Sequence, residues 1–255
     1  MATVARFNVT PVKSTALHHP ERIRIERWGA VGNRDFFFLD EDGKLFGGSK
    51  LGPLVRIRAD HDSETDVLRL RFPGGIEVEV PVAPDGEPFE VNFWGRPVEA
   101  RILEGPWTEH LSRFAGRELR LARVERPGDG NDVRPITLVS LASVEELARQ
   151  GGADGPLDPR RFRMTIELNG LGAHEEDTWA GRRVRVGGAV LLVGDPVPRC
   201  VVTTQDPSSG ERDFPTLSVI KGYRGVSADG ELLFGVYASV TEPGRARIGD
   251  PAELL

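Results

Sequence analysis

The stretch Val67-Leu-Arg-Leu-Arg-Phe-Pro-Gly-Gly-Ile-Glu-Val-Glu-Val80 contains two short runs in which apolar and charged residues alternate. Successive side chains of a β-strand point to opposite faces, so strict alternation predicts a strand with one buried and one solvated face. The Pro-Gly-Gly between the runs supplies the residues of a tight turn. The stretch therefore predicts two consecutive strands joined by a turn.

Short β-type segments of the same length fill the rest of the first hundred residues. They are rich in β-branched and aromatic residues, and we predict strands at 4–9, 22–28, 34–39, 55–59 and 89–93. Many short strands separated by turns are typical of a barrel or a sandwich. A helix is predicted at 107–114, where Trp107, Leu111 and Phe114 fall on one face. The fold class is therefore mainly β (α+β), with a few peripheral helices.

Residues 125–134 are polar, contain Gly and Pro and show no periodicity, which marks a boundary between two domains. We predict an N-terminal β domain at 1–124 and a second domain at 125–255. The second domain has predicted strands at 136–140, 163–168, 183–186, 189–193 and 232–240. Helices are predicted at 143–149, where Ser143 and Glu146 form a capping box, at the short 158–162 turn, and at 213–223.

Composition excludes several classes of protein. The 255 residues are 39% hydrophobic and 28% charged, as in ordinary soluble domains, and the net charge of −6 gives no general reason to bind nucleic acid. A single cysteine excludes a disulfide framework and a cysteine-ligated iron–sulfur cluster, and no flavin fingerprint is present. Haem is not expected either. No apolar run has the length of a membrane span, and the first residues lack a signal-peptide core, so a cytoplasmic location is expected.

That single cysteine lies in Pro198-Arg-Cys-Val-Val-Thr-Thr-Gln-Asp-Pro207. A thiolate can act as a nucleophile or as a soft metal ligand, although most isolated cysteines are small buried hydrophobes. The neighbouring Arg199 favours the thiolate by its charge, and the polar run after Cys200 indicates a loop that lines a site. Cys200 is therefore the first candidate for the chemistry of the chain.

Several other segments complete a pattern that extends from one end of the chain to the other. They are Thr10-Pro-Val-Lys-Ser14, Arg34-Asp-Phe-Phe-Phe-Leu39 with Asp42-Gly43, Phe162-Arg163, Glu176-Asp-Thr-Trp179, Arg199-Cys200 with Thr203-Thr-Gln-Asp-Pro207, Leu233-Phe-Gly-Val-Tyr237 and Ile248-Gly-Asp-Pro251. In this order they resemble proteins in which an N-terminal MOSC β-barrel precedes a MOSC domain, and most closely the amidoxime-reducing component and its bacterial relatives.

The resemblance implies a MOSC-type β-barrel with a smaller N-terminal β lobe, and a molybdenum cofactor whose pterin supplies two sulfur ligands and Cys200 a third. Cys200 and Asp132 are then the expected catalytic residues. The cofactor ends in a phosphate, which needs fixed cations in an acidic chain. The expected cofactor-binding residues are Lys13, Ser14, Arg34, Arg163, Thr165, Arg199, Thr203 and Thr204.

The chain departs from the family pattern in four places, and some candidates have plainer interpretations. Thr10 replaces a tyrosine, and Phe36 follows Arg34-Asp35 where the family has a second arginine. Met164-Thr165 replaces Pro-Asn, so a threonine hydroxyl takes the place of an amide, and Gly47-Gly-Ser-Lys50 replaces Thr-Ala-Arg-Gln. Thr203 and Thr204 can simply shape the turn after the cysteine. We expect Trp94, Trp107 and Trp179 in the core, and His174-Glu-Glu-Asp177 as a solvated acidic turn.

By resemblance, the chain is expected to reduce N-hydroxylated compounds such as amidoximes and hydroxylamines. Electrons are then expected from a separate electron-transfer protein or reductase, since the chain carries no second redox group. Two alternatives are open. The chain can be a carrier of the cofactor or of sulfur, working through Cys200, or a barrel that keeps the fold without the cofactor.

Overall fold

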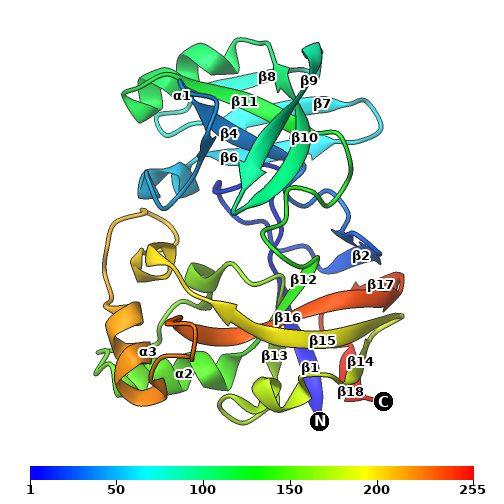
Figure 1. The fold of residues 1–255 in the computed structure, drawn as a ribbon, viewed down its shortest axis with the longest axis vertical. Coiled ribbons are helices and arrows are strands. Elements are labelled where there is room, and N and C mark those ends of the chain that lie inside the picture. The colour runs from blue at the N-terminus through cyan, green and yellow to red at the C-terminus, as the bar shows by residue number, and fades with distance from the viewer.

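The computed structural model describes residues 1–255 and has two β-rich lobes, one above the other in Figure 1. The lower lobe contains a closed seven-stranded barrel, and we call it the barrel lobe. The upper lobe contains two open sheets and is called the sheet lobe. Three connecting segments, at 8–21, 31–35 and 125–135, lie between the two lobes. We call these three segments together the joint.

The barrel is closed by the first strand of the chain. Its strand order is β1-β13-β12-β16-β15-β14-β18, and β1 pairs antiparallel with both β13 and β18. The strands are β1 (Ala2–Phe7), β12 (Ile136–Ser140), β13 (Ile166–Asn169), β14 (Arg183–Val186), β15 (Ala189–Pro198), β16 (Leu233–Glu242) and β18 (Pro251–Leu254). Closure removes the exposed edges that an open sheet of this size would leave.

Helices and short strands cover the barrel. The parallel pair β12 and β13 needs a crossover connection, which α2 (Leu141–Gln150) and the 3-10 turn η2 (Pro159–Phe162) supply. Beside α2 lies α3 (Thr216–Arg224), and both helices pack in one apolar cluster. A small sheet, β17-β2-β3, packs in a different cluster, the core of the barrel. The remaining elements of this lobe are β2 (Arg22–Glu26), β3 (Gly29–Ala30), β17 (Gly244–Arg247), η3 (Glu175–Trp179) and η4 (Val201–Thr204).

The sheet lobe is built around β4 (Phe36–Asp40), whose five residues are all buried. Phe36 and Phe38 belong to the core between the two sheets, whereas Phe37 and Leu39 belong to a second apolar cluster on the other face. A strand buried on both faces is continuously apolar, which explains Phe36-Phe-Phe-Leu39. The five-stranded sheet has the order β5-β4-β11-β10-β9, and the three-stranded sheet has the order β6-β7-β8.

The sheet lobe comprises β4, β5 (Leu45–Phe46), β6 (Arg58–Asp62), β7 (Val67–Arg71), β8 (Glu77–Pro81), β9 (Pro84–Phe93), β10 (Arg96–Leu103) and β11 (Leu119–Val124), with α1 (Trp107–Ala115) and η1 (Gly52–Arg56). The pair β7–β8 confirms the opening alternation, because Leu68, Leu70 and Val78 are buried and the intervening residues are not. The predicted strand at 55–59 begins only at Arg58, because Pro53 directs the preceding residues into a 3-10 turn.

The two lobes do not coincide with residues 1–124 and 125–255. Residues 1–30 carry β1, β2 and β3, and Val4, Phe7 and Ile25 lie in the core of the barrel lobe. The split at 124 therefore marks one passage of the chain through the joint. In space, residues 8–21 belong to the joint, whereas residues 1–7 and 22–30 on either side of them belong to the C-terminal lobe. Their apolar side chains find their partners on β13, β18 and β17.

Two local predictions in the barrel lobe are wrong for a common reason. Helix α2 begins after Ser140, and Ser143, the predicted N-cap, lies inside it. The Ser143 hydroxyl instead donates to Glu176 Oε1 at 2.7 Å. Glu176 is fully buried, so the prediction of a solvated acidic turn is wrong at this residue, whereas Glu175 is exposed. Asp177 pairs with Arg224 at 2.6 Å. In both places, contacts with residues that are distant in sequence determine the local structure.

No helix of the structure is long and apolar enough to cross a membrane.

Candidate functional site

Four cationic side chains and one carboxylate meet at the joint. Lys13 Nζ lies 2.6 Å from Asp132 Oδ1, and Arg34 Nη1 lies 2.8 Å from Asp132 Oδ2. Lys13 Nζ also donates to the Gly130 carbonyl at 3.1 Å. These residues come from the three connecting segments, so the joint between the lobes is also where the charges converge.

Arg163 and Arg199 complete the cation cluster, defined here as Lys13, Arg34, Arg163 and Arg199. Arg163 Nη2 donates to the Thr15 carbonyl at 2.7 Å, and Arg199 Nε donates to the Phe234 carbonyl at 2.8 Å. Neither arginine has a carboxylate partner. Main-chain oxygens hold both guanidinium groups, and Arg199 Nη2 also donates to Met164 Sδ at 2.5 Å. None of these partners is charged, which leaves the charge of both arginines available to an anion.

Burial lowers the pKa values of Lys13 and Arg163 in the cluster. Desolvation lowers the pKa of Lys13 to about 8, against the attraction of Asp132. Desolvation and the nearby charge of Arg34 lower the pKa of Arg163 to about 9. Although burial by itself raises it, the charges of Lys13 and Arg34 hold the pKa of Asp132 well below its usual range. At neutral pH the cluster therefore carries four positive charges beside the one negative charge of Asp132, the electrostatics of an anion site.

Backbone strain is concentrated in the same place. Six non-glycine residues of the chain have positive φ, and four of them belong to the joint or its border: Ser14 (75°), Arg34 (62°), Trp94 (55°) and Arg163 (52°). A left-handed backbone costs a non-glycine residue on the order of 1–3 kcal/mol, and such residues gather at ligand sites. The fold thus retains a strained backbone conformation at the residues whose side chains form or border the site.

Ser14 lies between the cation cluster and a glycine loop of the sheet lobe. Its hydroxyl oxygen accepts a hydrogen bond from Gly48 N at 3.0 Å, which leaves the hydroxyl hydrogen free to donate. A Cβ at Gly47 would lie only 2.7 Å from Ser14 Oγ. Gly47 therefore lets this loop approach Ser14 closely, whereas a Cβ on Gly48 would make only ordinary contacts.

Cys200 lies where β15 ends and η4 begins, and its free thiol is exposed. The predicted binding residues Thr203 and Thr204 use their hydroxyls within this turn, donating to the carbonyls of Cys200 at 3.0 Å and Val201 at 2.7 Å. No three His, Cys, Asp or Glu side chains gather to hold a metal ion. The exposed Cys200 thiolate could serve as one protein ligand to a soft metal.

The Cys200 turn is held from the sheet lobe. Gln205 Nε2 donates to the Gly48 carbonyl at 3.0 Å, and the backbones of Gly52 and Gly210 pack so closely that a Cβ on Gly52 would lie 2.0 Å from Gly210 O. We call this contact between 47–52 and 201–210 the glycine clasp. It ties the position of the thiol to the position of the other lobe.

Thr165 stands apart from the other predicted residues. It is buried in the barrel wall, and its Oγ1 lies 3.2 Å from Thr137 Oγ1, while Thr137 Oγ1 accepts from Thr165 N at 2.8 Å. The hydroxyl contacts β12 and not the cation cluster. The structure thus brings together Lys13, Ser14, Arg34, Asp132 and Arg163, and leaves Thr165 in the seam between two strands.

Trp94 was missed by the sequence reasoning. Trp107 and Trp179 are core residues as predicted, but the prediction that Trp94 is buried is wrong, because it is 67% exposed. Its Nε1 donates to Asp132 Oδ1 at 3.0 Å. The only sequence signal was the following Gly95, which indicates a turn and therefore an exposed position.

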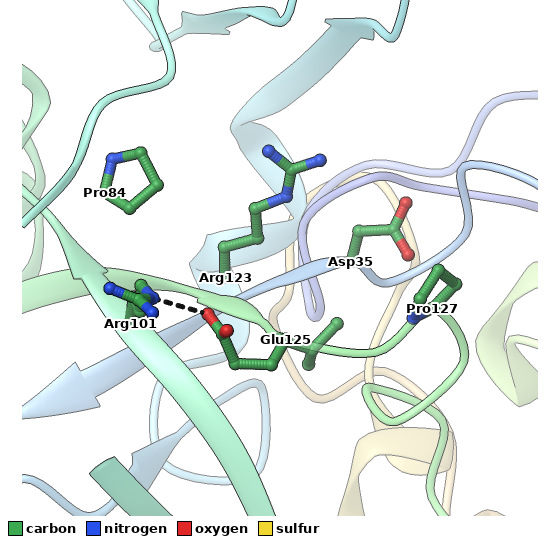
Figure 2. A pocket seen from close by; sticks show the side chains of 7 residues that line it. Asp35, Pro84, Arg101, Arg123, Glu125 and Pro127 are labelled. Carbon is green, nitrogen blue, oxygen red and sulfur yellow. Dashed lines mark hydrogen bonds and ion pairs between the residues drawn. The ribbon is translucent and has the colours of Figure 1, made fainter. Parts of the chain in front are cut away.

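A pocket of about 250 Å³ opens where the sheet lobe meets the joint (Figure 2). Its two arginines are already paired, Arg101 with Glu125 at 2.9 Å and Arg123 with Asp66 at 2.9 Å. It includes Asp35 but none of the predicted site residues. Because a carboxylate already balances the charge of each of these arginines, the cation cluster is the stronger candidate site.

Two family models match the chain. The MOSC N-terminal beta barrel domain matches residues 1–118, and the MOSC domain matches residues 125–253. The chain belongs to the MOSC family. The cation cluster and Cys200 are thus drawn from both matched segments.

Two relatives and one solved structure align with nearly the whole chain. The mitochondrial amidoxime reducing component 2 of Homo sapiens is 34% identical over 98% of this chain and 83% of its own length. The molybdenum cofactor sulfurase of Caenorhabditis briggsae is 33% identical over 96% of this chain but only 35% of its own length. The YUAD protein from Bacillus subtilis aligns over 100% of this chain and 96% of its own, with a TM-score of 0.46 and 14% identity.

The glycine clasp predicts a stability defect for Gly52→Ala. The added methyl group cannot fit beside Gly210, so we expect the free energy of unfolding to fall by about 1–3 kcal/mol, as for other overpacked sites. Because the clasp holds the Cys200 turn, alkylation of Cys200 should also change in rate. Urea unfolding and iodoacetamide labelling measure the two effects. Gly155→Ala, where a Cβ meets nothing within 4 Å, is the control; equal stability of the two variants would contradict the clasp.

The lowered pKa of Lys13 predicts that anion binding weakens at alkaline pH. Only charged Lys13 attracts an anion, and its pKa of about 8 means that the charge is lost as the pH rises from 7 to 9. We expect sulfate, which stays fully ionised over this range, to bind about tenfold more weakly at pH 9 than at pH 7. Isothermal titration measures the affinity. Lys13→Arg should move the decline to higher pH, and a wild-type affinity that is equal at both pH values would contradict the assignment.

Proposed function

We propose that the chain binds molybdenum cofactor at the joint and reduces N-hydroxylated compounds with electrons from a separate donor. The observation that carries the proposal is that a cation cluster with a net positive charge, whose lysine is buried and whose arginines are half-buried, occurs together with an exposed thiol. The chain has no second cysteine that could form an internal disulfide with this thiol. The relatives named for amidoxime reduction support the choice of substrate class.

The residues at the joint fit the cofactor chemically. Lys13 and Arg34 offer charge, and Ser14 offers a hydroxyl donor, to a terminal phosphate. Arg163 is an ordered cation with no carboxylate partner, suited to lie against the polar edge of the pterin. Cys200 supplies a soft thiolate to the metal.

When bound, the cofactor would supply the two-electron redox chemistry that no side chain of this protein can perform. The overall reaction adds two electrons and two protons to the N–O bond and releases the amine or amidine and water. The chain's own part is to hold the cofactor and the Cys200 thiolate in fixed positions. Asp132 stays ionised at neutral pH, so in the described arrangement it orients Lys13 and Arg34 and does not donate a proton. Its prediction as a catalytic residue remains a prediction.

Arg199 has a positioning role in this proposal. Its guanidinium donates to the carbonyls of Phe234 and Phe162 at 2.8 and 3.3 Å and lies 5.2 Å from the centre of the Phe162 ring. These contacts join the end of β15 to β16 and to η2. They fix the residue directly before Cys200, so that the thiol is presented from a rigid support.

A second function is favoured by the exposure of the thiol. An exposed, unpaired Cys200 can also carry sulfur as a persulfide, and the relative named as a molybdenum cofactor sulfurase aligns with 96% of this chain. A carrier takes up labelled sulfur on Cys200 and has no reductase activity. A reductase turns over an amidoxime with an artificial electron donor.

Replacing the thiolate tests the proposal. Wild type purified from a cofactor-competent host should contain molybdenum and pterin in near-stoichiometric amounts, and Cys200→Ser should lose the metal or bind it weakly because a hydroxyl is a poor ligand for it. Metal analysis and pterin fluorescence measure both. Ser63→Ala, a change at an exposed residue in the turn between β6 and β7, is the control. Wild type free of metal and pterin, beside a loaded control molybdoenzyme from the same cells, would contradict the proposal and favour the carrier or a barrel without cofactor.

A further inference from the structure

Trp94 occupies a turn that its own side chain disfavours. Phe93 pairs with Arg96 across β9 and β10, so Trp94 and Gly95 form a two-residue connection in which φ is +55° and +89°. Connections with positive φ at both residues favour Asn, Asp or Gly at the first position. A large aromatic residue is unfavourable in such a turn, so the turn itself does not explain why tryptophan occurs there.

The indole stands at the edge of the cation cluster with most of its surface free. It is 67% exposed, although the other aromatic side chains of this hairpin, Phe89 and Phe93, are half-buried and fully buried. Its Nε1 donates at 3.0 Å to Asp132 Oδ1, the oxygen that also pairs with Lys13. One edge of the ring is therefore fixed at the site and its faces are open.

The hairpin that carries Trp94 is rigidly attached to the joint. Arg96 Nη2 donates to the carbonyls of Asp129 and Asn131 at 2.7 and 2.8 Å, and its guanidinium lies 5.9 Å from the centre of the Phe93 ring. These bonds tie the base of the turn to the same loop that presents Asp132. The indole is held in place before any ligand arrives, as a binding surface requires.

We propose that Trp94 is the aromatic wall of the site, against which the planar conjugated ring of the bound cofactor stacks. The inference rests on the proposed function, because it needs a ligand with both an anionic group and a flat ring. Charges at Lys13 and Arg34 attract the anionic end, and an exposed indole face adds an attraction that depends on the ring and not on charge. Strain at Trp94 is then retained because the ring is needed there.

Two substitutions separate stacking from mere attachment to Asp132. Trp94→Asn suits the turn and removes the ring, so it should leave the unfolding midpoint in urea equal to or above that of wild type. Trp94→Phe keeps a flat ring and removes only the N–H that binds Asp132. A ring that stacks is replaceable by phenylalanine, whereas a donor that positions Asp132 is not.

The test is a binding titration of protein purified from a host that lacks the cofactor. The probes are metal-free molybdopterin, followed by fluorescence, and inorganic pyrophosphate, which has the charge without the ring. We expect Trp94→Asn to weaken molybdopterin binding about tenfold (about 1.4 kcal/mol) and to leave pyrophosphate binding within about twofold of wild type. Trp94→Phe should bind molybdopterin within about threefold of wild type.

Three results would overturn the inference. Unchanged molybdopterin binding by Trp94→Asn would show that the ring has no role, although the proposed function would stand. Equal losses in Trp94→Asn and Trp94→Phe would assign Trp94 to the positioning of Asp132 alone. Wild type that binds neither molybdopterin nor pyrophosphate would overturn the inference together with the proposed function.

Discussion

The balance of charge at the joint is the constraint on which the rest of the structure depends. Lys13 and Arg34 are mostly buried, and a buried cation is costly unless a partner compensates it. Asp132 compensates two of the four cations, and main-chain carbonyls hold the other two. Such an arrangement is stable enough to persist and still attracts an anion. The fold brings three connecting segments to one place in order to build it.

The position of the site explains why the two lobes are interleaved in sequence. Residues 8–21 leave the barrel lobe, insert Val12 into the core of the sheet lobe and return to β2. This excursion carries Lys13 and Ser14, while β1 before it closes the barrel. The glycine clasp adds a contact between the lobes beside Cys200. A ligand in the joint would therefore touch both lobes and couple their relative position to the site.

Much of the fold was predictable because it follows from local patterns. Alternation predicted β7 and β8, the apolar run at 36–39 predicted a strand, and the spacing of Trp107 and Leu111 predicted α1. The sequence also placed Cys200 at a loop. Resemblance to the family, and not periodicity, selected Lys13, Arg34 and Arg163 as site residues.

The remaining features depend on partners that are distant in sequence. Asp132 meets Lys13 across 119 residues, and nothing near Asp132 indicates an ion pair. Ser143 fits a capping box by its spacing, but Glu176, 33 residues away, takes its hydroxyl. Tryptophan is a large apolar residue that is usually expected in a core, and Trp94 is exposed only because of the geometry of its hairpin. Local rules cannot report such contacts, because tertiary packing decides them.

The most direct measurement of the charge balance is the stability of Asp132→Asn as sulfate is added. Without a multivalent anion, the loss of the carboxylate charge leaves Lys13 and Arg34 uncompensated, and the free energy of unfolding should fall by about 1–3 kcal/mol. Sulfate should restore most of that loss and should bind the variant more tightly than wild type, since it takes the place of Asp132. Asp42→Asn, at an exposed ion pair with Lys44, should behave like wild type. An Asp132→Asn protein that is as stable as wild type and indifferent to sulfate would contradict the account.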